Sequence, residues 1–463
     1  MSSPKIHFEI SERKMILYLF DIIFVWLGLY VVAYFCDFEY LKSLTTEGVP
    51  AIFLGIYLSV FGIIFEMYKL QVASNEFQIL RSTILTATTT TFVYLLTPVF
   101  SPVLPSNRIQ ILAFFVILFS SLMVWRLFYV RFLASNRFMQ TAILVCENAE
   151  VEKLILGLED IDPHYKIIGY VSLDAVEFDT TRNHYVAQIM RDNLSDFVKE
   201  NNVAEIVIAS QKTDGITTVL YQQLLHLLES GNVIREYTQV YESKTQRIPV
   251  HYMARDFYSF FPFSRSNQNK LYQTIVRGLD ILFSFIGVTF GIVILPLVLL
   301  GNILGSNGPL FYVQKRVGKD GVVFNILKFR TMVKHAENAG AVFASHNDAR
   351  ITRFGKFMRK TRIDEIPQCI NILKGDMAVI GPRPERPEFV KEIAKRMPFY
   401  ETRHVIKPGL TGWAQVNYAY GETIEDSLIK LQYDLYYIKH RSFYLDLNIA
   451  LKTITTVLFY RGQ

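Results

Sequence analysis

Long runs of apolar residues occupy the first third of the chain and return once in its second half. Four runs in the first third each approach the ~20 residues that a helix needs to cross a bilayer: Met15–Phe35, Pro50–Met67, Ile79–Val99 and Ile109–Leu133. A fifth run, Leu279–Leu300, is also long enough to cross. The pattern predicts four transmembrane helices within residues 1–137 and a further membrane helix at about residues 271–304.

Between these regions the apolar runs become short and alternate with segments of helical periodicity. Three runs are typical of buried strands, namely Thr141–Cys146, Tyr165–Leu173 and Val203–Ser210, and Glu150–Glu159 is predicted to be a helix. This alternation predicts a small Rossmann-like parallel α/β domain at residues 138–265. A dinucleotide-binding version would have glycines directly after the first strand, but Cys146–Ala149 contains none. We therefore expect a structural or regulatory role for this domain.

Composition agrees with a membrane protein. Hydrophobic residues make up 51% of the 463 residues, only 19% are charged, and the mean hydropathy is +0.23, which is high for a soluble protein. The net charge of +6 suits an anionic lipid surface or phosphorylated substrates, and we expect no nucleic-acid partner. The cysteines Cys36, Cys146 and Cys369 show no disulfide or zinc-ligand spacing.

The charges that flank the apolar runs predict their orientation. The first run is too long for a cleavable signal peptide, so we expect it to remain as a membrane span. Basic residues concentrate before the first run, between the second and third, and at the end of the fourth: Lys5, Arg13, Lys14, Lys69, Arg81, Arg126, Arg131 and Arg137. By the positive-inside rule, the N-terminus and everything after residue 137 face the cytoplasm. We interpret Asp21 and Glu66, which lie within or at the rim of these runs, as polar helix contacts.

Two adjacent acids mark the polar chemistry of the second half. Asp364 and Glu365 stand just before Pro367, and proline is tolerated in the first turn of a helix, so a helix is predicted to begin near Asp364 and to end at Gly375. The plain structural interpretation is that Asp364 caps this helix. Carboxylates and phosphates are both favoured at such a helix N-terminus.

The cations around these acids favour a chemical role. Arg359, Lys360 and Arg362 precede the acids, and Arg383 follows, held between Pro382 and Pro384. An extended segment would also place Lys328 and Arg330 on one face, where they would repel unless an anion lay between them. Acids that can hold Mg²⁺, surrounded by cations, are the groups that phosphoryl transfer requires.

The chain from about residue 270 onward resembles the bacterial sugar transferases, the polyprenyl-phosphate hexose-1-phosphate transferases that start glycan assembly. The residues that carry the resemblance occur in order: Arg277, Asp280, Pro296, Gly308-Pro309, KFRTM at Lys328–Met332, RKTRIDEIPQ at Arg359–Gln368, LKGDM at Leu373–Met377, GPRPE at Gly381–Glu385 and KPGLTGWAQV at Lys407–Val416. The four spans and the α/β domain resemble the larger members of this family in architecture only. The resemblance implies a catalytic domain at residues 270–463.

The resemblance also implies a reaction. Asp364 occupies the place of the nucleophile, which attacks the sugar-bearing phosphorus of a UDP-sugar, releases UMP and forms a phosphosugar–aspartate intermediate. Polyprenyl (undecaprenyl) phosphate then accepts the phosphosugar. Asp364 and Glu365 are expected to hold Mg²⁺, and Arg383, Arg359, Lys328 and Arg330 are expected to bind phosphate. By resemblance to the larger members the donor would be UDP-glucose or UDP-galactose, with UDP-linked N-acetylated sugars as the alternative, and the product would initiate exopolysaccharide, capsule or O-antigen assembly.

Because nucleotide sugars are cytoplasmic, the resemblance places the catalytic domain at the cytoplasmic face of the bacterial inner membrane. We therefore expect the fifth run to form a re-entrant helix, broken at Pro296, that returns to the side it entered from. The expected partners are the donor, the lipid phosphate and the bilayer, and the sequence is compatible with a homodimer. A membrane-tethered nucleotide-sugar sensor without turnover is the main alternative. A nucleotide-sugar dehydratase or epimerase lacks its glycine-rich turn, and a transporter would carry its polar groups inside the spans.

Overall fold

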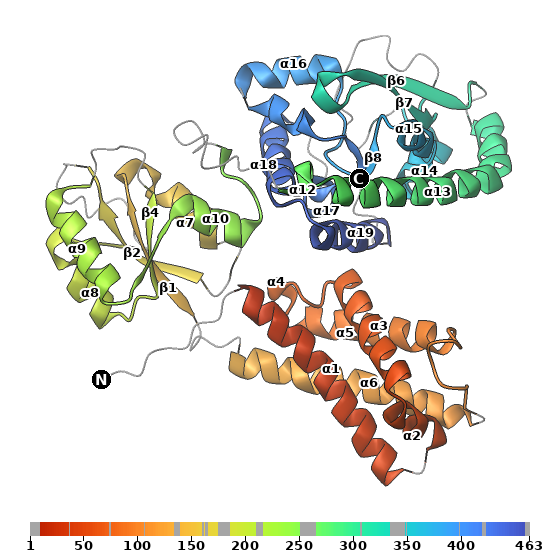
Figure 1. The fold of residues 1–463 in the computed structure, drawn as a ribbon, viewed down its shortest axis with the longest axis horizontal. Coiled ribbons are helices and arrows are strands. Elements are labelled where there is room, and N and C mark those ends of the chain that lie inside the picture. The colour runs from red at the N-terminus through yellow and green to blue at the C-terminus, as the bar shows by residue number, and fades with distance from the viewer. Residues whose placement is uncertain are drawn as a thin grey trace. The chain divides into compact units, whose positions relative to one another are not determined.

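The computed structural model describes residues 10–36, 38–73, 76–105, 107–133, 139–159, 162, 165–174, 186–209, 216–250, 265–305, 308–333, 348, 350–397, 399–418 and 423–458. The chain divides into two compact units, Met1–Thr245 and Gln246–Gln463 (Figure 1). Lys5 and Arg137, on which the predicted orientation partly rests, lie outside the described residues.

The first unit begins with helices that fit the apolar runs. They are α1 (Ile10–Phe35), α2 (Glu39–Thr46), α3 (Gly48–Ile64), α4 (Leu70–Ala73), α5 (Glu76–Leu95) and α6 (Arg108–Phe128). Within the described part of this region, α1 and α6 are each long and apolar enough to span a membrane, and α2 with α3, bent by 93° at their junction, form a third candidate. The predicted run Ile79–Val99 corresponds to α5, whose many threonines make it less apolar. The predicted count of four N-terminal spans is therefore not confirmed.

A buried ion pair connects two of these helices. The guanidinium of Arg126 on α6 donates from Nε to Asp21 Oδ1 on α1 over 3.0 Å, and its Nη1 donates to the carbonyl oxygen of Met67 over 2.8 Å. Both charged side chains are almost completely buried. Glu66 forms an ion pair with Lys69 over 2.6 Å. The interpretation of Asp21 and Glu66 as polar helix contacts is therefore confirmed.

The remainder of the first unit is a parallel α/β domain, as predicted. Its five strands lie in the order β3-β2-β1-β4-β5 and are all parallel: β1 (Gln140–Cys146), β2 (Tyr165–Ser172), β3 (Ala187–Gln188), β4 (Glu205–Ala209) and β5 (Val233–Glu236). The helices of this domain are α7 (Val151–Glu159), α8 (Leu194–Glu200), α9 (Thr218–Glu229) and α10 (Tyr237–Thr245). In the glycine-free turn after β1, the amide N–H of Asn148 donates to the carboxylate of Asp174 over 2.8 Å. In a dinucleotide-binding domain, N–H groups of this turn would bind a phosphate of the nucleotide. Here the carboxylate of Asp174 occupies the N–H group of Asn148.

The second unit combines a long apolar helix with small sheets and short helices. Strands β6 (Phe311–Val317) and β7 (Val323–Phe329) form an antiparallel hairpin, and β8 (Ala378–Ile380) pairs in parallel with β9 (Gly409–Thr411). The helices are α12 (Arg265–Gln268), α13 (Lys270–Gly305), α14 (Arg353–Lys360), α15 (Gln368–Lys374), α16 (Pro387–Arg396), α17 (Trp413–Asn417), α18 (Ile424–His440) and α19 (Phe443–Leu458). The largest hydrophobic core of this unit contains Trp413, Leu431, Tyr437 and Ile449.

Helix α13 is the fifth apolar run, and it continues through Pro296 over 36 residues. Its length and hydropathy are sufficient for a membrane span. Pro296 does not end the helix, although Figure 1 shows the ribbon of α13 changing direction toward its C-terminal end. A re-entrant course is therefore not confirmed by the helix alone.

Three glycines allow the strands β8 and β9 to approach closely. Gly381 follows β8, Gly409 begins β9, and Gly412 follows β9. A Cβ atom on Gly409 would collide with the backbone nitrogen of Gly381, and one on Gly412 would collide with the carbonyl oxygen of Gly381. These glycines are required because backbone, rather than a flexible side chain, occupies the space.

We expect Gly409→Ala to lower the free energy of unfolding of the second unit by about 3 kcal/mol, because the collision forces the two strands apart. Gly278→Ala on α13 is the matched control, since no atom lies within 4 Å of its added Cβ. Thermal unfolding of the purified full-length protein in detergent measures both. Equal unfolding temperatures for the two variants would contradict the explanation.

Candidate active site

The two acids lie in a short 3₁₀ turn that precedes α15. Arg362 has a left-handed backbone (φ 58°), the 3₁₀ turn covers Ile363–Glu365, and α15 begins only at Gln368. Pro367 has no N–H to donate to the carbonyl of Ile363, so an α-helix cannot extend through the acids. The prediction that the helix begins near Asp364 is wrong by about one turn, and Asp364 does not cap α15 because Pro367 holds the N-cap position. Gly375 ends α15 at φ 97°, as predicted.

Glu365 is neutralised by three cations. Its Oε1 accepts from Arg383 over 2.8 Å and lies 3.4 Å from Lys328 Nζ, while its Oε2 lies 3.2 Å from Arg362 Nη1. The carboxyl group is buried. Burial alone would raise the pKa of Glu365, but Arg383, Lys328 and Arg362 together hold this pKa well below its ordinary value. Glu365 is therefore ionised at any physiological pH.

Asp364 is buried beside it in a different electrostatic environment. Its side chain is 8% exposed, and its carboxylate makes no hydrogen bond or ion pair with any residue that the structure describes. Burial, and then the charge of Glu365, raise the pKa of Asp364 to about 6, against the opposing effect of Lys328, Arg359 and Arg362. The turn thus contains one neutralised carboxylate and one carboxylate that is available for chemistry.

Four other residues predicted from the sequence occupy distinct places. Arg383 and Lys328 contact Glu365 as described, and burial lowers the pKa of Lys328 to about 8. Arg359 affects the pKa of Asp364 and donates from Nε to Thr331 Oγ1 over 2.9 Å. Arg330 lies just beyond β7 and donates to Asn302 of α13 over 3.3 Å. The structure therefore brings Lys328, Arg359 and Arg383 to the acid pair and shows Arg330 in contact with α13.

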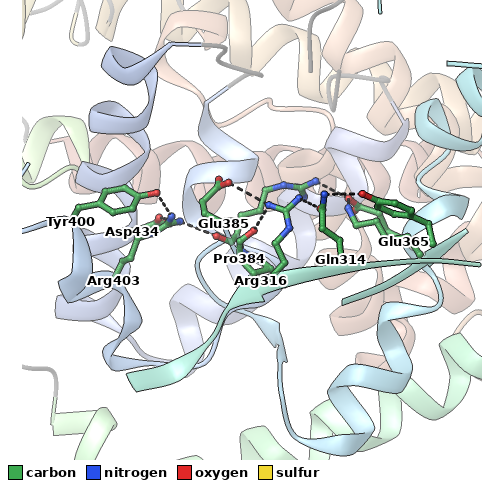
Figure 2. Close-up of polar contacts among 11 residues, drawn as sticks. Gln314, Arg316, Glu365, Pro384, Glu385, Tyr400, Arg403 and Asp434 are labelled. Carbon is green, nitrogen blue, oxygen red and sulfur yellow. Dashed lines mark hydrogen bonds and ion pairs between the residues drawn. The ribbon is translucent and has the colours of Figure 1, made fainter. Parts of the chain in front are cut away.

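The loop that carries Arg383 is held by two arginines that the sequence reasoning missed as site residues. Arg403 Nη2, from the 3₁₀ segment Tyr400–Val405, donates to the carbonyl oxygen of Arg383 over 3.0 Å. Arg316 Nη1, from β6, donates to the carbonyl oxygen of Pro384 over 3.0 Å. Figure 2 shows this network, with Tyr400, Arg403 and Asp434 at one end and Glu365 at the other. An arginine that binds a backbone carbonyl leaves no pattern in a single sequence, which explains why these roles were missed.

Helix α13 supports the site directly. Arg277 donates to the carbonyl oxygens of Ile372 and Leu373 at the end of α15, over 2.7 and 2.9 Å. Asp280 accepts the amide N–H of Val379, on the strand β8 that leads to the Arg383 loop, over 2.8 Å. Because these two residues are one turn apart on α13, a single face of this apolar helix orients both the acid-bearing segment and the loop.

The carboxylates fit a magnesium ion only in part. Within the described residues no group of three or more His, Cys, Asp or Glu could hold a metal. Both oxygens of Glu365 are already engaged by cations, whereas the carboxylate of Asp364 is available. Since Mg²⁺ is often bound by one or two carboxylates together with substrate phosphates, Asp364 fits such a site and Glu365 fits poorly. The magnesium site stays a prediction.

Comparison with known proteins agrees with these features. The family described as bacterial sugar transferase matches residues 271–460. A putative undecaprenyl-phosphate N-acetylgalactosaminyl 1-phosphate transferase of Bacillus subtilis is 39% identical over 160 residues, which are 35% of this chain and 88% of that protein. The chain therefore belongs to the bacterial sugar transferase family, and the resemblance found in the sequence is confirmed.

Two longer relatives match part of the chain. A UDP-N-acetylgalactosamine-undecaprenyl-phosphate N-acetylgalactosaminephosphotransferase of Aeromonas hydrophila is 43% identical over 224 residues, 48% of this chain and 51% of that protein. A UDP-glucose:undecaprenyl-phosphate glucose-1-phosphate transferase of Xanthomonas campestris pv. campestris is 43% identical over 169 residues, 35% of each chain. The matched region thus spans about half of the first protein and about a third of the second.

We expect Asp364→Asn to stabilise the protein at neutral pH. The pKa of Asp364 is about 6 in the folded state against an ordinary value of 3.8, so the folded state binds this proton more tightly than the unfolded state. The free energy of unfolding therefore falls as the pH rises from about 4 to 6. Above pH 6 the protein carries the full cost of an ionised Asp364 in the folded state.

Asparagine removes that penalty, so the free energy of unfolding at pH 7.5 should rise by roughly 2–3 kcal/mol. The gain should vanish at pH 4, where the native carboxyl group is protonated in the folded protein. Denaturant unfolding of the full-length protein at the two pH values measures the difference. If Asp364→Asn instead lowers the free energy of unfolding at pH 7.5, the ionised carboxylate of Asp364 stabilises the folded protein and the prediction is wrong.

Proposed function

We propose that this protein transfers a hexose-1-phosphate from a UDP-sugar to polyprenyl (undecaprenyl) phosphate and releases UMP. The observation that carries the proposal is the contrast within the acid turn. Glu365 is neutralised by three cations, whereas the carboxylate of the adjacent buried Asp364 has no hydrogen bond or ion pair with the residues that the structure describes. Membership of the bacterial sugar transferase family supports the same reaction. Contacts with cations reduce the nucleophilicity of a carboxylate, and among the described residues Asp364 is the acid of the pair whose oxygens have no such contact.

The reaction proceeds in two displacements at one phosphorus atom. An oxygen of the Asp364 carboxylate attacks the sugar-bearing phosphorus of the UDP-sugar. The bond between that phosphorus and the bridging oxygen breaks, and UMP leaves with the oxygen. The product is a mixed anhydride between the phosphosugar and Asp364. An oxygen of polyprenyl phosphate then attacks the same phosphorus, the bond to Asp364 breaks, and the carboxylate is restored.

Charge explains why the site contains so many cations. An ionised carboxylate that approaches an anionic diphosphate is repelled by it, and the repulsion grows in a buried site of low dielectric constant. Arg383, Lys328 and Arg359 oppose this repulsion and stabilise the charge that develops on the transferred phosphoryl group. Asp364 would help to hold a magnesium ion, and such an ion would supply further neutralisation of the substrate phosphates.

Glu365 acts in this proposal by positioning rather than by attack. Arg383, Lys328 and Arg362 would repel one another if they converged on an empty space. The Glu365 carboxylate allows the three cations to lie together beside Asp364. It therefore keeps the phosphate-binding groups assembled before substrate arrives, which reduces the reorganisation needed during reaction.

The contacts of α13 support a course within one leaflet. Between Arg277 and Asn302 the helix advances by roughly 37 Å, and both residues contact the polar domain. Between them, a Cβ atom on Gly287 would lie 2.5 Å from Cys369 Sγ, and one on Gly291 would lie 3.0 Å from Ile366. The domain thus follows α13 along its length, and a perpendicular crossing would carry the charged site into the hydrocarbon core at high energetic cost. We propose that α13 is re-entrant and that the site faces the cytoplasm.

Cysteine labelling of spheroplasts tests this topology. Cys36 is exposed at the end of α1, on the predicted outer side, so the native chain should react with an impermeant maleimide. In a Cys36→Ser background, Ser230→Cys in the α/β domain and Glu392→Cys on α16 introduce exposed thiols. Both should react only after the membrane is broken. Labelling of Glu392→Cys in sealed spheroplasts would indicate a complete crossing by α13.

The proposed reaction is tested with purified full-length protein, Mg²⁺, polyprenyl phosphate and separate UDP-sugars. The named relatives differ in sugar, so the donors should include UDP-glucose, UDP-galactose and UDP-N-acetylgalactosamine. We expect UMP release with one donor and a phosphosugar adduct on the peptide that contains Asp364, detected by mass spectrometry. Asp364→Asn should reduce UMP release by roughly a thousandfold or more, because it removes the nucleophile.

Glu365→Gln should reduce the rate by about a hundredfold, because the cations lose their common partner. Asp320→Asn, which changes an exposed acid in the same unit, is the control and should leave the rate unchanged. Release of UDP would indicate an ordinary glycosyltransferase. No product with any donor would favour the membrane-tethered sensor.

A further inference from the structure

Arg383 is held from two directions. In front, its Nη2 donates to Glu365 Oε1 over 2.8 Å. Behind, its own carbonyl oxygen accepts from Arg403 Nη2 over 3.0 Å. The side chain can therefore point at a phosphate with a fixed geometry only while its backbone keeps this second contact. The prolines on either side restrict the backbone dihedral angles of the loop but do not fix where the loop lies in the unit.

Arg403 is itself placed by two buried partners. Its Nη2 lies 2.6 Å from Asp434 Oδ2 of α18, and its Nη1 donates to the hydroxyl group of Tyr400 over 2.6 Å. Asp434, Tyr400 and Arg403 are all 4% exposed or less. A buried ion pair is by itself weak evidence for a role in stability. What distinguishes this pair is that the same guanidinium group reaches the backbone of a site residue.

The geometry requires arginine rather than any cation. Three acceptors, a carboxylate, a phenol oxygen and a backbone carbonyl, are arranged around one guanidinium group. A planar fork with several fixed N–H donors matches all three at once, whereas the ammonium group of lysine is a point charge on a flexible stem. Lysine could satisfy Asp434 but would lose the simultaneous contacts with Arg383 and Tyr400.

We propose that Arg403 is a positioning residue that fixes the direction of Arg383 toward the diphosphate of the donor, with Asp434 and Tyr400 holding Arg403 in place. This inference rests on the proposed function, because it assigns Arg403 to the phosphate-binding part of that site. In this proposal Arg403 acts on the substrate through Arg383 and not by direct contact. It connects the core between α18 and the segment Tyr400–Val405 to the loop that faces the acid pair (Figure 2).

A double-mutant cycle tests the inference with the full-length protein in nanodiscs and UDP as the probe. Dissociation constants for UDP are measured by calorimetry for the native chain, Arg403→Lys, Arg383→Ala and the double variant. Arg403→Lys should weaken binding by about tenfold when Arg383 is present and by less than about twofold when Arg383 is alanine, because residues that act through one another are not additive. A merely structural defect would weaken binding by the same factor in both backgrounds.

Tyr437→Phe is the matched control. It removes a buried tyrosine hydroxyl group that donates to Asp446 over 2.7 Å, in the same unit but without contact to the Arg383 loop. Its affinity for UDP should equal that of the native chain within about twofold. If Arg403→Lys does not fold, Asp434→Asn replaces it in the cycle, since asparagine has the same size and keeps an acceptor oxygen.

The outcomes separate this inference from the proposed function. Equal losses in both Arg383 backgrounds overturn the positioning role, and UMP release by the native chain would still support the reaction. Coupled losses in a protein that releases no UMP support the positioning role and contradict the reaction. A native affinity for UDP that does not depend on Arg383 overturns the inference.

Discussion

The site depends on the unequal neutralisation of two neighbouring carboxylates in one buried turn. Two unpaired negative charges this close would repel strongly at low dielectric constant. Three cations converge on Glu365 and leave Asp364 without a partner among the described residues. The left-handed backbone of Arg362 and the missing N–H of Pro367 keep these residues in a 3₁₀ turn. The left-handed conformation of Arg362 is unfavourable for a residue other than glycine. It is retained in a turn that gives Asp364 and Glu365 different electrostatic environments.

Cations that surround a reactive carboxylate must be held by parts of the fold outside the turn. Lys328 is carried by the β6–β7 hairpin, and Arg383 is carried by a loop whose carbonyl groups are bound by Arg403 and Arg316. Gly381, Gly409 and Gly412 have no Cβ atom that would collide with the neighbouring backbone, so two short strands can lie close together beside this loop. The precision of the site therefore comes from backbone contacts made behind it, which agrees with the requirement for preorganised charges.

Sequence reasoning was strongest where chemistry or periodicity repeats in a recognisable way. The parallel α/β domain followed from alternating strands and helices, and the clustering of Lys328 and Arg383 around Glu365 agrees with the charge and motif pattern, while the catalytic roles of these residues stay predictions. It failed where a segment is only marginally apolar or where a contact forms between residues far apart in the sequence. The threonine-rich α5 has helical length but too little hydropathy for a clear span. Arg403 and Arg316 bind carbonyl groups that no side-chain pattern encodes, and the contact of Arg330 with Asn302 of α13 likewise depends on the tertiary structure.

Helix α13 combines a long apolar surface with contacts to the candidate active site. Its apolar residues are largely exposed, whereas its few buried positions include Asp280 and Asn302, which bind the polar domain. Ile366 and Cys369, immediately after the acid pair, pack against glycines of the same helix. The turn that contains Asp364 therefore lies about one layer of side chains away from α13, and the position of this helix determines the position of the turn. In the proposed reaction the acceptor is a phosphate fixed at the headgroup level of the bilayer, so a nucleophile placed by the membrane helix itself meets that phosphate without leaving the interface.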